Sequence, residues 1–548
     1  MLLPSLAQLS VLVFGVRSSY AAPPTAGIPA ITLDQGTFQG VTDGLINKFL
    51  GIPFAKPPMG DLRFRLPVSN DPYTGVHSAI TFGASCPQQA LNLPIPGDIT
   101  SSAINSVINT ALTIATPESE DCLTLNVWTP VGARAGTKLP VVAWIFGGGF
   151  ENGGTSTYDG GVIVKRSIEL GQPIVYVSMN YRVSAFGFLP GKEVKAAGVG
   201  NLGLQDQRQA FRWIQKYINV FGGDPTRVTI WGESAGAISV ALQMVTNGGD
   251  TEGLFHGAFM QSGSPIPVGD ITDGQNFYDA LVSETGCAGS SDTLQCLREA
   301  PFDTLKAAVD DSPGIFSFQS LALTWLPRAD GNFLADLPQQ LVLKGSVADI
   351  PFVTGDCDDE GTLFALSSLN VTNEFALRDY ITTVFVPDAP ASDIAQLLSL
   401  YPADVTQGSP FGTGTLNVLT PEYKRIAALL GDLVFQSARR FFLQNRSSKQ
   451  NTWSFINKRL KTASVLGSAH ATDLLNVYGP GDMSDFLINF VNHLDPNGAI
   501  QGLWPKYDTA SSQLMTFLDG PVPLTLTSDK FREDAISFIT TLALDNPI

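Results

Sequence analysis

The sequence predicts an α/β protein in which helices cover both faces of a mostly parallel central sheet. Short runs rich in β-branched and aromatic residues alternate with segments whose apolar residues recur at helical spacing. This alternation is typical of parallel strands joined by crossover helices. No Pro-, Gly- or Ser-rich linker divides the chain, so residues 22–548 are expected to form one domain. The strands are expected at residues 123–128, 141–146, 174–179, 228–231, 258–261 and 350–354.

The composition limits the classes of partner. The 548 residues include 50 acidic and 33 basic side chains, giving a net charge of −17. Because basic side chains are fewer than acidic ones, the chain has few positive charges that could replace the counterions of nucleic-acid phosphates. This argues against a nucleic-acid partner. After the N-terminus no stretch is apolar for long enough to cross a bilayer. No metal and no cofactor is expected.

The first 21 residues are typical of a secretory signal peptide. An apolar segment runs from Leu6 to Val16, and the small residues Ser19 and Ala21 suit cleavage after Ala21. Pro23 and Pro24 end the segment abruptly, which argues against a first buried helix. The sequence therefore predicts an extracellular protein.

The cysteines and two sequons agree with export. In an oxidising compartment the first four of the five cysteines are expected to pair, and Cys357 is expected to be a buried thiol. The expected disulfides are Cys86–Cys122 and Cys287–Cys296. The candidate glycosylation sites are Asn370 and Asn445, each in an Asn-X-Ser/Thr sequon.

Residues 228–237, VTIWGESAGA, carry the most informative motif. A β-branched run leads into a G-x-S-x-G turn centred on Ser234, and a helix-compatible segment, 237–245, follows. Gly232 and Gly236 fit a turn too tight for a Cβ. Such a turn exposes the serine hydroxyl at the positive end of the following helix. Ser234 is therefore the candidate nucleophile.

A serine nucleophile needs a histidine base and an acid that orients the base. After a strand–turn–helix serine the chain order is acid, then histidine. Of the four histidines, His77 precedes Ser234, and His256 follows it too closely to leave room for an acid loop. His470 lies in a loop of small residues, whereas His493 has the setting of an ordinary helix end. We favour His470.

The acid is expected between Ser234 and His470, at the end of a strand. The run 350–354 leads into a loop with four carboxylates. Residue patterns alone identify this loop but not the residue. The candidates are Asp356, Asp358, Asp359 and Glu360.

Backbone donors for a developing oxyanion are expected after the strand 141–146. This strand ends in Gly147-Gly148-Gly149-Phe150, where the absence of a Cβ lets N–H groups approach a substrate oxygen. The N–H of Ala235, directly after the nucleophile, is expected to add a further donor.

Several motifs resemble the type-B carboxylesterase/lipase family of α/β-hydrolases, which also includes cholinesterases. They are spread over most of the mature chain. The matching segments are residues 51–58 (GIPFAKPP), 119–123 (SEDCL), 201–207 (NLGLQDQ), 221–225 (FGGDP), the turn at Ser234, and 261–265 (QSGSP).

This resemblance implies the α/β-hydrolase fold and assigns the site by position. The family's acid falls on Glu360 and its base on His470. Its oxyanion donors fall on Gly148, Gly149 and Ala235, and Ser262 corresponds to a serine near the triad. No triad position departs from the family pattern.

Within the family the chain is most similar to Candida rugosa-type lipases and sterol esterases of fungi. In these proteins the first disulfide loop carries a mobile lid, which corresponds here to residues 87–121. One helical face of this loop is apolar and its opposite face is polar and uncharged. The apolar face holds Ile104, Val107, Ile108, Ala111, Leu112 and Ala115. Two readings stay open for a further set of apolar residues, which suit either an acyl tunnel or ordinary core packing: Phe316, Phe318, Leu321, Leu323, Trp325, Leu363 and Phe364.

The leading hypothesis is a secreted serine esterase that acts on long-chain lipid esters at a lipid interface. The alternative is an esterase for aryl or hydroxycinnamoyl (feruloyl-type) esters, because this fold accepts both. A cholinesterase would need a choline-binding tryptophan, and the first disulfide loop has no aromatic residue. The intact Ser234, Glu360 and His470 argue against a non-catalytic, cholinesterase-like adhesion protein.

Overall fold

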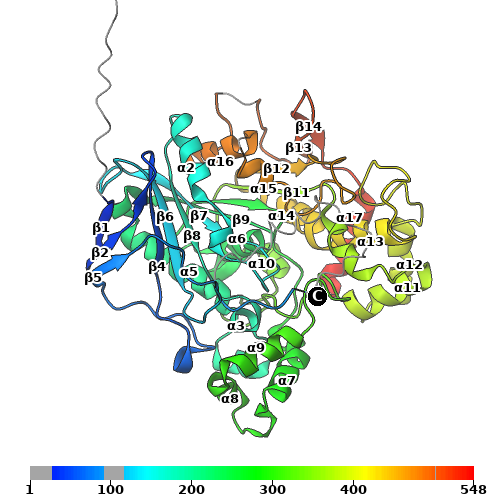
Figure 1. The fold of residues 1–548 in the computed structure, drawn as a ribbon. Coiled ribbons are helices and arrows are strands. Elements are labelled where there is room, and N and C mark those ends of the chain that lie inside the picture. The colour runs from blue at the N-terminus through cyan, green and yellow to red at the C-terminus, as the bar shows by residue number, and fades with distance from the viewer. Residues whose placement is uncertain (1–27, 92–116, 480, 500–501, 548) are drawn as a thin grey trace, which may run out of the picture.

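A computed structural model describes residues 28–91, 117–479, 481–499 and 502–547. Its described strands form an 11-stranded sheet and a small sheet, β1-β2-β5, near the N-terminus (Figure 1). The strand order of the large sheet is β14-β13-β12-β11-β10-β9-β7-β8-β6-β4-β3. The strands are β1 Ala30–Leu33, β2 Gln35–Gln39, β3 Val41–Thr42, β4 Ile46–Pro53, β5 Thr74–Ser78, β6 Thr124–Pro130, β7 Leu139–Ile145, β8 Val175–Met179, β9 Gly223–Glu233, β10 Gly257–Gln261, β11 Phe352–Cys357, β12 Thr452–Asn457, β13 Gln513–Phe517 and β14 Leu524–Ser528.

The centre of the large sheet is parallel and its edges are antiparallel. Neighbouring strands from β8 through β7, β9, β10, β11 and β12 to β13 pair in parallel, whereas β6, β4, β3 and β14 join in antiparallel register. The central strands β7, β8, β10, β11 and β12 are buried almost throughout. Burial on both faces explains why these strands have nearly continuous apolar runs.

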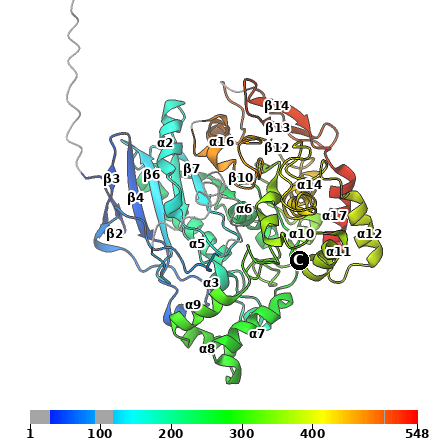
Figure 2. The same ribbon diagram turned by 45° about the vertical axis from the view of Figure 1, so that its right-hand side comes forward.

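Helices cover both faces of this sheet, as the sequence predicts (Figures 1 and 2). On one face α2 and α16 pack against each other, and α5, α6 and α14 lie on the other. The helices are α2 Gly160–Glu169, α3 Ser184–Phe188, α4 Lys192–Ala197, α5 Leu202–Tyr217, α6 Ala235–Val245, α7 Gln275–Glu284, α8 Thr293–Glu299, α9 Phe302–Asp311, α10 Pro338–Lys344, α11 Glu374–Tyr380, α12 Ala391–Leu400, α13 Tyr423–Gly431, α14 Ser437–Arg446, α15 Leu474–Val477, α16 Asp482–His493 and α17 Glu533–Asp545.

All six strands expected from the sequence are present, as β6 to β11. The largest difference is at β9, which begins at Gly223 rather than at residue 228. The strand β12 was not expected from the sequence, although it pairs with β11 and leads toward His470. The strands β3, β4, β13 and β14, toward the two ends of the sheet, were not expected from the sequence either.

Both expected disulfides, Cys86–Cys122 and Cys287–Cys296, are formed, and Cys357 is a buried free thiol. The signal peptide expected at residues 1–21 lies outside the described residues. Residues 92–116, which make up most of the expected lid loop, also lie outside them. No helix in the described part of the chain is long and apolar enough to span a membrane. Across the same residues no cluster of His, Cys, Asp or Glu is suited to hold a metal ion.

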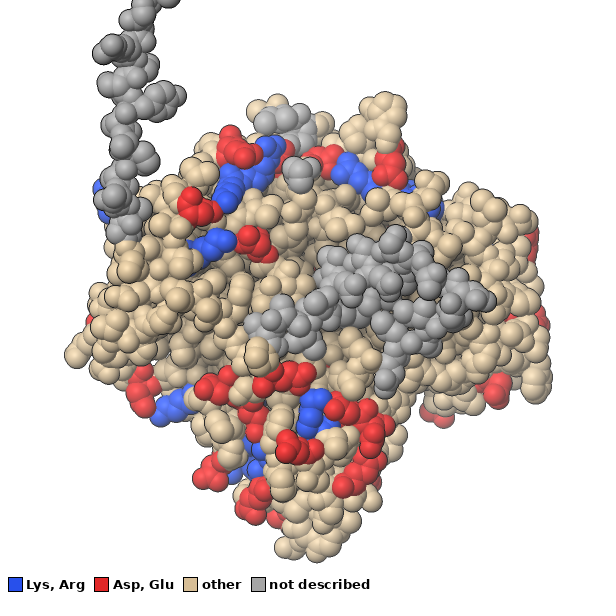
Figure 3. All heavy atoms as spheres, in the orientation of Figure 1, with Lys and Arg blue, Asp and Glu red and all other residues tan. Residues whose placement is uncertain are grey.

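The helices α7, α8 and α9 form a lobe that projects below the sheet (Figure 1). Figure 3 shows that acidic side chains gather on this lobe, whereas much of the remaining visible face is uncharged. The lobe matters for the site because α9 leads into the segment 312–328, which passes beside the carboxyl ends of the central strands.

Candidate active site

Ser234 lies in a sharp turn between β9 and α6. Its backbone has φ 55° and ψ −127°, a conformation that non-glycine residues rarely adopt. A Cβ on Gly232 would lie 2.4 Å from the backbone carbon of Gly236, and one on Gly236 would lie 2.0 Å from the carbonyl oxygen of Ile145. These contacts explain both glycines of the motif. The turn raises the serine above the end of the sheet.

Three side chains that follow the carboxyl ends of β9, β11 and β12 meet at this point. The Nε2 atom of His470 lies 2.8 Å from Oγ of Ser234. On the other side of the imidazole, Nδ1 lies 2.5 Å from Oε2 of Glu360. The second oxygen of Glu360 accepts a hydrogen bond of 2.6 Å from the backbone N–H of Cys357. The carboxylate is therefore fixed by the end of β11, and it can orient the ring.

The other three carboxylates of the acid loop bind elsewhere. Asp356 accepts a hydrogen bond from Arg439, at 2.7 Å. Asp358 and Asp359 both bind the ammonium group of Lys461. Only Glu360 of the four carboxylates contacts the imidazole among the described residues.

The loop that carries His470 is tied directly to the acid loop. Asp359 and Ala469 form an isolated parallel β-bridge, in which the N–H of Asp359 donates to the carbonyl of Ser468 at 3.1 Å. The Asp359 carboxylate in turn accepts from the N–H of Ser468, at 2.8 Å. This bridge holds the residues next to Glu360 and His470 in fixed register, although 110 positions separate the two in the sequence.

Two carboxyl groups set the electrostatics of the imidazole. Burial lowers the pKa of His470, but the negative charges of Glu360 and Glu233 outweigh burial and raise that pKa above its ordinary value of 6.5. Glu233 lies 3.4 Å from Nε2 of His470 and is itself buried. Burial raises the pKa of Glu233 to about 8. Glu233 was not predicted from the sequence, because the variable position before the serine carries no signal of a titrating role.

The loop after β7 lies beside Ser234 with free backbone donors. Gly148 and Gly149 have φ angles of 116° and 64°, and their N–H groups donate to no described residue. The N–H of Ala235 lies in the first turn of α6, where helix amides have no partner within the helix. Unpaired donors beside a serine hydroxyl are suited to bind a developing oxyanion.

Apolar side chains close the cavity in front of the serine. Its lining includes Ser234, His470, Gly148, Gly149 and Glu233, together with Ile315, Phe316, Leu363, Phe364 and Ala471. Phe316, Leu363 and Phe364 are among the residues named as candidates for an acyl tunnel. Ile315 was missed, because a single isoleucine in an irregular segment has no distinguishing pattern.

The remaining candidates lie apart from this cavity. His493 is the last residue of α16, His256 precedes β10 and His77 lies in β5 of the small sheet. The hydroxyl of Ser262 approaches Sγ of Cys357 at 4.0 Å, so it is linked to the acid loop rather than to His470. Asn370 is exposed, whereas Asn445 lies within α14 and donates its amide to the carbonyl of Phe441.

The sheet is mostly parallel, and a strand–turn–helix at its end carries a serine. This serine is hydrogen-bonded to a histidine, which is hydrogen-bonded to a glutamate. Together these features define the α/β-hydrolase class. The family model described as the carboxylesterase family matches residues 28–538. The chain belongs to the carboxylesterase family, and it is a carboxylic-ester hydrolase.

Relatives extend over nearly the whole chain. Lipase 4 of Diutina rugosa is 44% identical over 518 residues, which are 92% of each protein. A secreted triacylglycerol lipase of Gibberella zeae is 41% identical, and the match covers 95% of this chain and 91% of that lipase. The crystal structure of EstA from Aspergillus niger superposes with a TM-score of 0.80 at 26% identity, covering 95% of this chain and 99% of EstA.

A methyl group at Gly148 is expected to lower kcat about 100- to 1,000-fold, the usual effect of losing one oxyanion donor. In Gly148→Ala the new Cβ would lie 2.4 Å from the carbonyl oxygen of Asn152, at a φ that alanine rarely adopts. The loop must therefore shift and carry its N–H away from the serine. Initial rates on a p-nitrophenyl ester measure the effect.

The matched control is Gly132→Ala. This glycine also has a positive φ, 90°, but a Cβ there meets nothing within 4 Å, and the residue lies in the turn between β6 and β7. The control carries a similar backbone strain and should retain full activity. Comparable rates for the two variants would contradict a role for Gly148 in binding the oxyanion.

Proposed function

We propose that residues 22–548 form the catalytic domain of a secreted lipase that hydrolyses long-chain lipid esters through Ser234, His470 and Glu360. The observation that carries the mechanism is the continuous pair of hydrogen bonds from Ser234 Oγ to His470 Nε2 and from His470 Nδ1 to Glu360. The proposed oxyanion donors are the N–H groups of Gly148, Gly149 and Ala235.

In the first half of the reaction, Ser234 Oγ attacks the ester carbonyl carbon while Nε2 of His470 takes the hydroxyl proton. The carbonyl oxygen becomes an oxyanion that the backbone N–H groups stabilise. His470 then returns the proton to the departing alcohol, and an acyl-enzyme remains. In the second half His470 takes a proton from water, the hydroxide attacks the acyl group, and the proton returns to Ser234 as the carboxylic acid leaves. Glu360 stabilises the imidazolium at both stages.

Two observations support a lipid ester as the substrate. The cavity beside Ser234 has apolar walls from Ile315, Phe316, Leu363 and Phe364, which suit an aliphatic acyl chain. In addition, relatives at 41–44% identity are named lipases, and two of the similar fungal proteins are named as secreted. Secretion of this chain is also supported by residues 1–21 and by the two disulfides.

A comparison of esters tests the substrate class. With p-nitrophenyl esters from acetate to palmitate, kcat/KM should rise about tenfold or more with chain length, because each added methylene buries apolar area in the site. Emulsified triolein and cholesteryl oleate should be hydrolysed, and methyl ferulate only slowly.

Ser234→Ala protein in the same assays provides the background rate. If methyl ferulate were hydrolysed faster than triolein, and kcat/KM fell with acyl length, the lipase assignment would be wrong and the feruloyl-type esterase would replace it. Hydrolysis of triolein without cholesteryl oleate would restrict the substrate class to glycerol esters.

A further inference from the structure

Glu151 is a buried acid that follows the loop with the proposed oxyanion donors by two positions. Its side chain is 0% exposed. Among the described residues its carboxyl group has one hydrogen-bond partner: Oε2 accepts from the backbone N–H of Ile315 at 2.8 Å, and Oε1 has none. A carboxyl group without water and with one neutral donor is unusual, because buried acids ordinarily have several donors or a cation.

Glu151 and Ile315 close a ring of contacts around Gly148 and Gly149. The backbone N–H of Glu151 donates to the carbonyl of Gly148 at 3.1 Å. On the other side of the loop, a Cβ on Gly149 would lie 2.7 Å from Cδ1 of Ile315, so this isoleucine packs directly on the glycine. The hydrogen bond from Ile315 to the Glu151 carboxyl therefore fixes the wall of the catalytic cavity against the two glycines.

A third segment, at the base of the first disulfide loop, joins the same contact through Gln89. Its backbone N–H donates to the carbonyl of Glu151 at 3.0 Å, and its Nε2 donates to the carbonyl of Ser312 at 2.7 Å. The side-chain amide and the carboxyl group flank Gly314, where a Cβ would lie 3.4 Å from Oε2 of Glu151 and 3.5 Å from Cδ of Gln89. Residues 86–91, 147–154 and 312–317 thus meet at Glu151.

The surroundings of Glu151 favour its neutral form. Oε1 of Gln89 is also buried and, like Oε1 of Glu151, accepts from no described residue. A carboxylate would add a buried negative charge to these two unpaired acceptors, whereas a carboxylic acid brings a donor of its own. Burial raises the pKa of Glu151 to about 8, although the N–H of Ile315 opposes this rise. The side chain is therefore a neutral acid at pH 7.

The charged groups on the elements packed around Glu151 supply no counter-ion within the described chain. Each nearby cation already has a carboxylate partner, and the other nearby charged groups are acids. The pairs are Lys306 with Asp310 and Glu118, and Arg182 with Asp206, and the further acids are Asp311 and Glu233. An ionised Glu151 would have to move toward water.

We propose that Glu151 is a positioning residue for ester hydrolysis, whose neutral carboxyl group holds the loop of Gly148 and Gly149 against the cavity wall at Ile315. The inference rests on the proposed role of these two glycines as oxyanion donors. Glu151 does not touch the substrate and acts through the loop. When it loses its proton, the carboxylate has no described cation to bind, so the link at Ile315 weakens and the donors lose their position beside Ser234.

The test compares Glu151→Gln with the wild type over a range of pH. The amide keeps the size of the side chain and an acceptor for the N–H of Ile315, but it does not ionise. At pH 6.5 kcat should lie within about threefold of the wild type. The ratio of kcat in Glu151→Gln to kcat in the wild type should rise about tenfold or more by pH 9.5, above the pKa of Glu151. His470 titrates in both proteins, so its effect cancels in this ratio.

Glu151→Ala removes the link at every pH. At pH 6.5 its kcat should fall about tenfold or more while KM changes less than about threefold, because oxyanion donors act on the transition state. Rescue by glutamine at the same position separates positioning from simple loss of a buried side chain. Rates on p-nitrophenyl butyrate, corrected for the uncatalysed reaction, measure both parameters, and thermal unfolding checks the fold.

Asp330→Asn is the matched control. Asp330 is also a buried acid whose pKa is raised by burial, and it accepts from the backbone N–H groups of Asn332 and Leu334. It does not line the cavity beside Ser234. Its kcat ratio to the wild type should therefore stay within about twofold from pH 6.5 to 9.5.

Two results would overturn the proposal, even if Glu151→Ala failed to fold. One is a ratio for Glu151→Gln that stays within twofold up to pH 9.5, and the other is an equal rise for Asp330→Asn. Gly148→Ala in the same assay separates this inference from the proposed function. Full activity of Gly148→Ala would contradict both. Loss of activity in Gly148→Ala, with both Glu151 variants like the wild type, would contradict the role of Glu151 alone.

Discussion

Replacing Ser234 with alanine is expected to lower kcat for ester hydrolysis by about 10⁴-fold or more, and His470→Ala is expected to have a similar effect. The first change removes the proposed nucleophile, and the second removes the proposed base, whose Nε2 lies 2.8 Å from the serine oxygen. The backbone donors at Gly148, Gly149 and Ala235 are untouched in both variants, so a slow background reaction should remain. Initial rates on p-nitrophenyl butyrate measure the loss.

The double variant and a distant histidine provide the controls. Because Ser234 and His470 act on the same proton in the proposed mechanism, the double variant should be about as slow as either single variant. His493→Ala, at the end of α16, should keep full activity. If His493→Ala were inactive while His470→Ala retained activity, the assignment of the base would be wrong. Thermal unfolding of each variant checks that the lost rate is not lost fold.

Glu360→Gln is expected to lower kcat by about 10³- to 10⁴-fold and to change the pH profile of the residual activity. The amide no longer supplies the negative charge that accepts from Nδ1 of His470 and stabilises the imidazolium. The charge of Glu360 raises the pKa of His470 against the opposing effect of burial. Without that charge the pKa falls, so His470 stays unprotonated, and able to act as a base, down to a lower pH. The acid limb of kcat/KM should therefore move to lower pH.

Asp358→Asn is the matched control for this variant. Asp358 lies in the same loop and is as strongly buried, but it pairs with Lys461 rather than with His470. Loss of a buried ion pair should reduce the free energy of unfolding by about 3–5 kcal/mol and leave kcat within about tenfold. A larger fall in kcat for Asp358→Asn than for Glu360→Gln would contradict the choice of acid. An acid limb that stays in place in Glu360→Gln would contradict the electrostatic role.

The sequence alone determined the fold class and the candidate nucleophile, because these depend on local patterns. Alternating apolar runs require a buried parallel sheet with helices on both faces, and β6 to β11 lie where those runs predict them. A sharp strand–turn–helix leaves no space for a Cβ at the two glycines around Ser234. The glycine spacing in the motif therefore indicates the turn without knowledge of the tertiary contacts. Chain order then reduced four histidines to two, and the small residues of its loop favoured His470 over His493.

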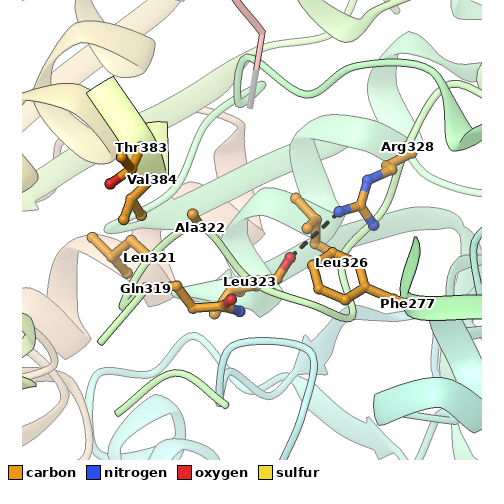
Figure 4. Close-up of a pocket in the computed structure, with 9 residues that line it drawn as sticks. All are labelled: Phe277, Gln319, Leu321, Ala322, Leu323, Leu326, Arg328, Thr383 and Val384. Atoms are coloured by element: carbon orange, nitrogen blue, oxygen red, sulfur yellow. Dashed lines mark hydrogen bonds between the residues drawn. The ribbon is translucent and has the colours of Figure 1, made fainter. Parts of the chain in front are cut away.

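Tertiary structure decided what depends on neighbours that are distant in the sequence. Residue patterns left four carboxylates as candidates for the acid, and only the packing of Arg439 and Lys461 against Asp356, Asp358 and Asp359 leaves Glu360 to contact the imidazole. The residue pattern also named Leu321 and Leu323 as candidates for an acyl tunnel, and only the fold shows that they line a different cavity (Figure 4) from the one beside Ser234. Contacts between separate strands and loops decide which charges are paired and which cavity a side chain lines. The order of residues along the chain does not reveal these contacts.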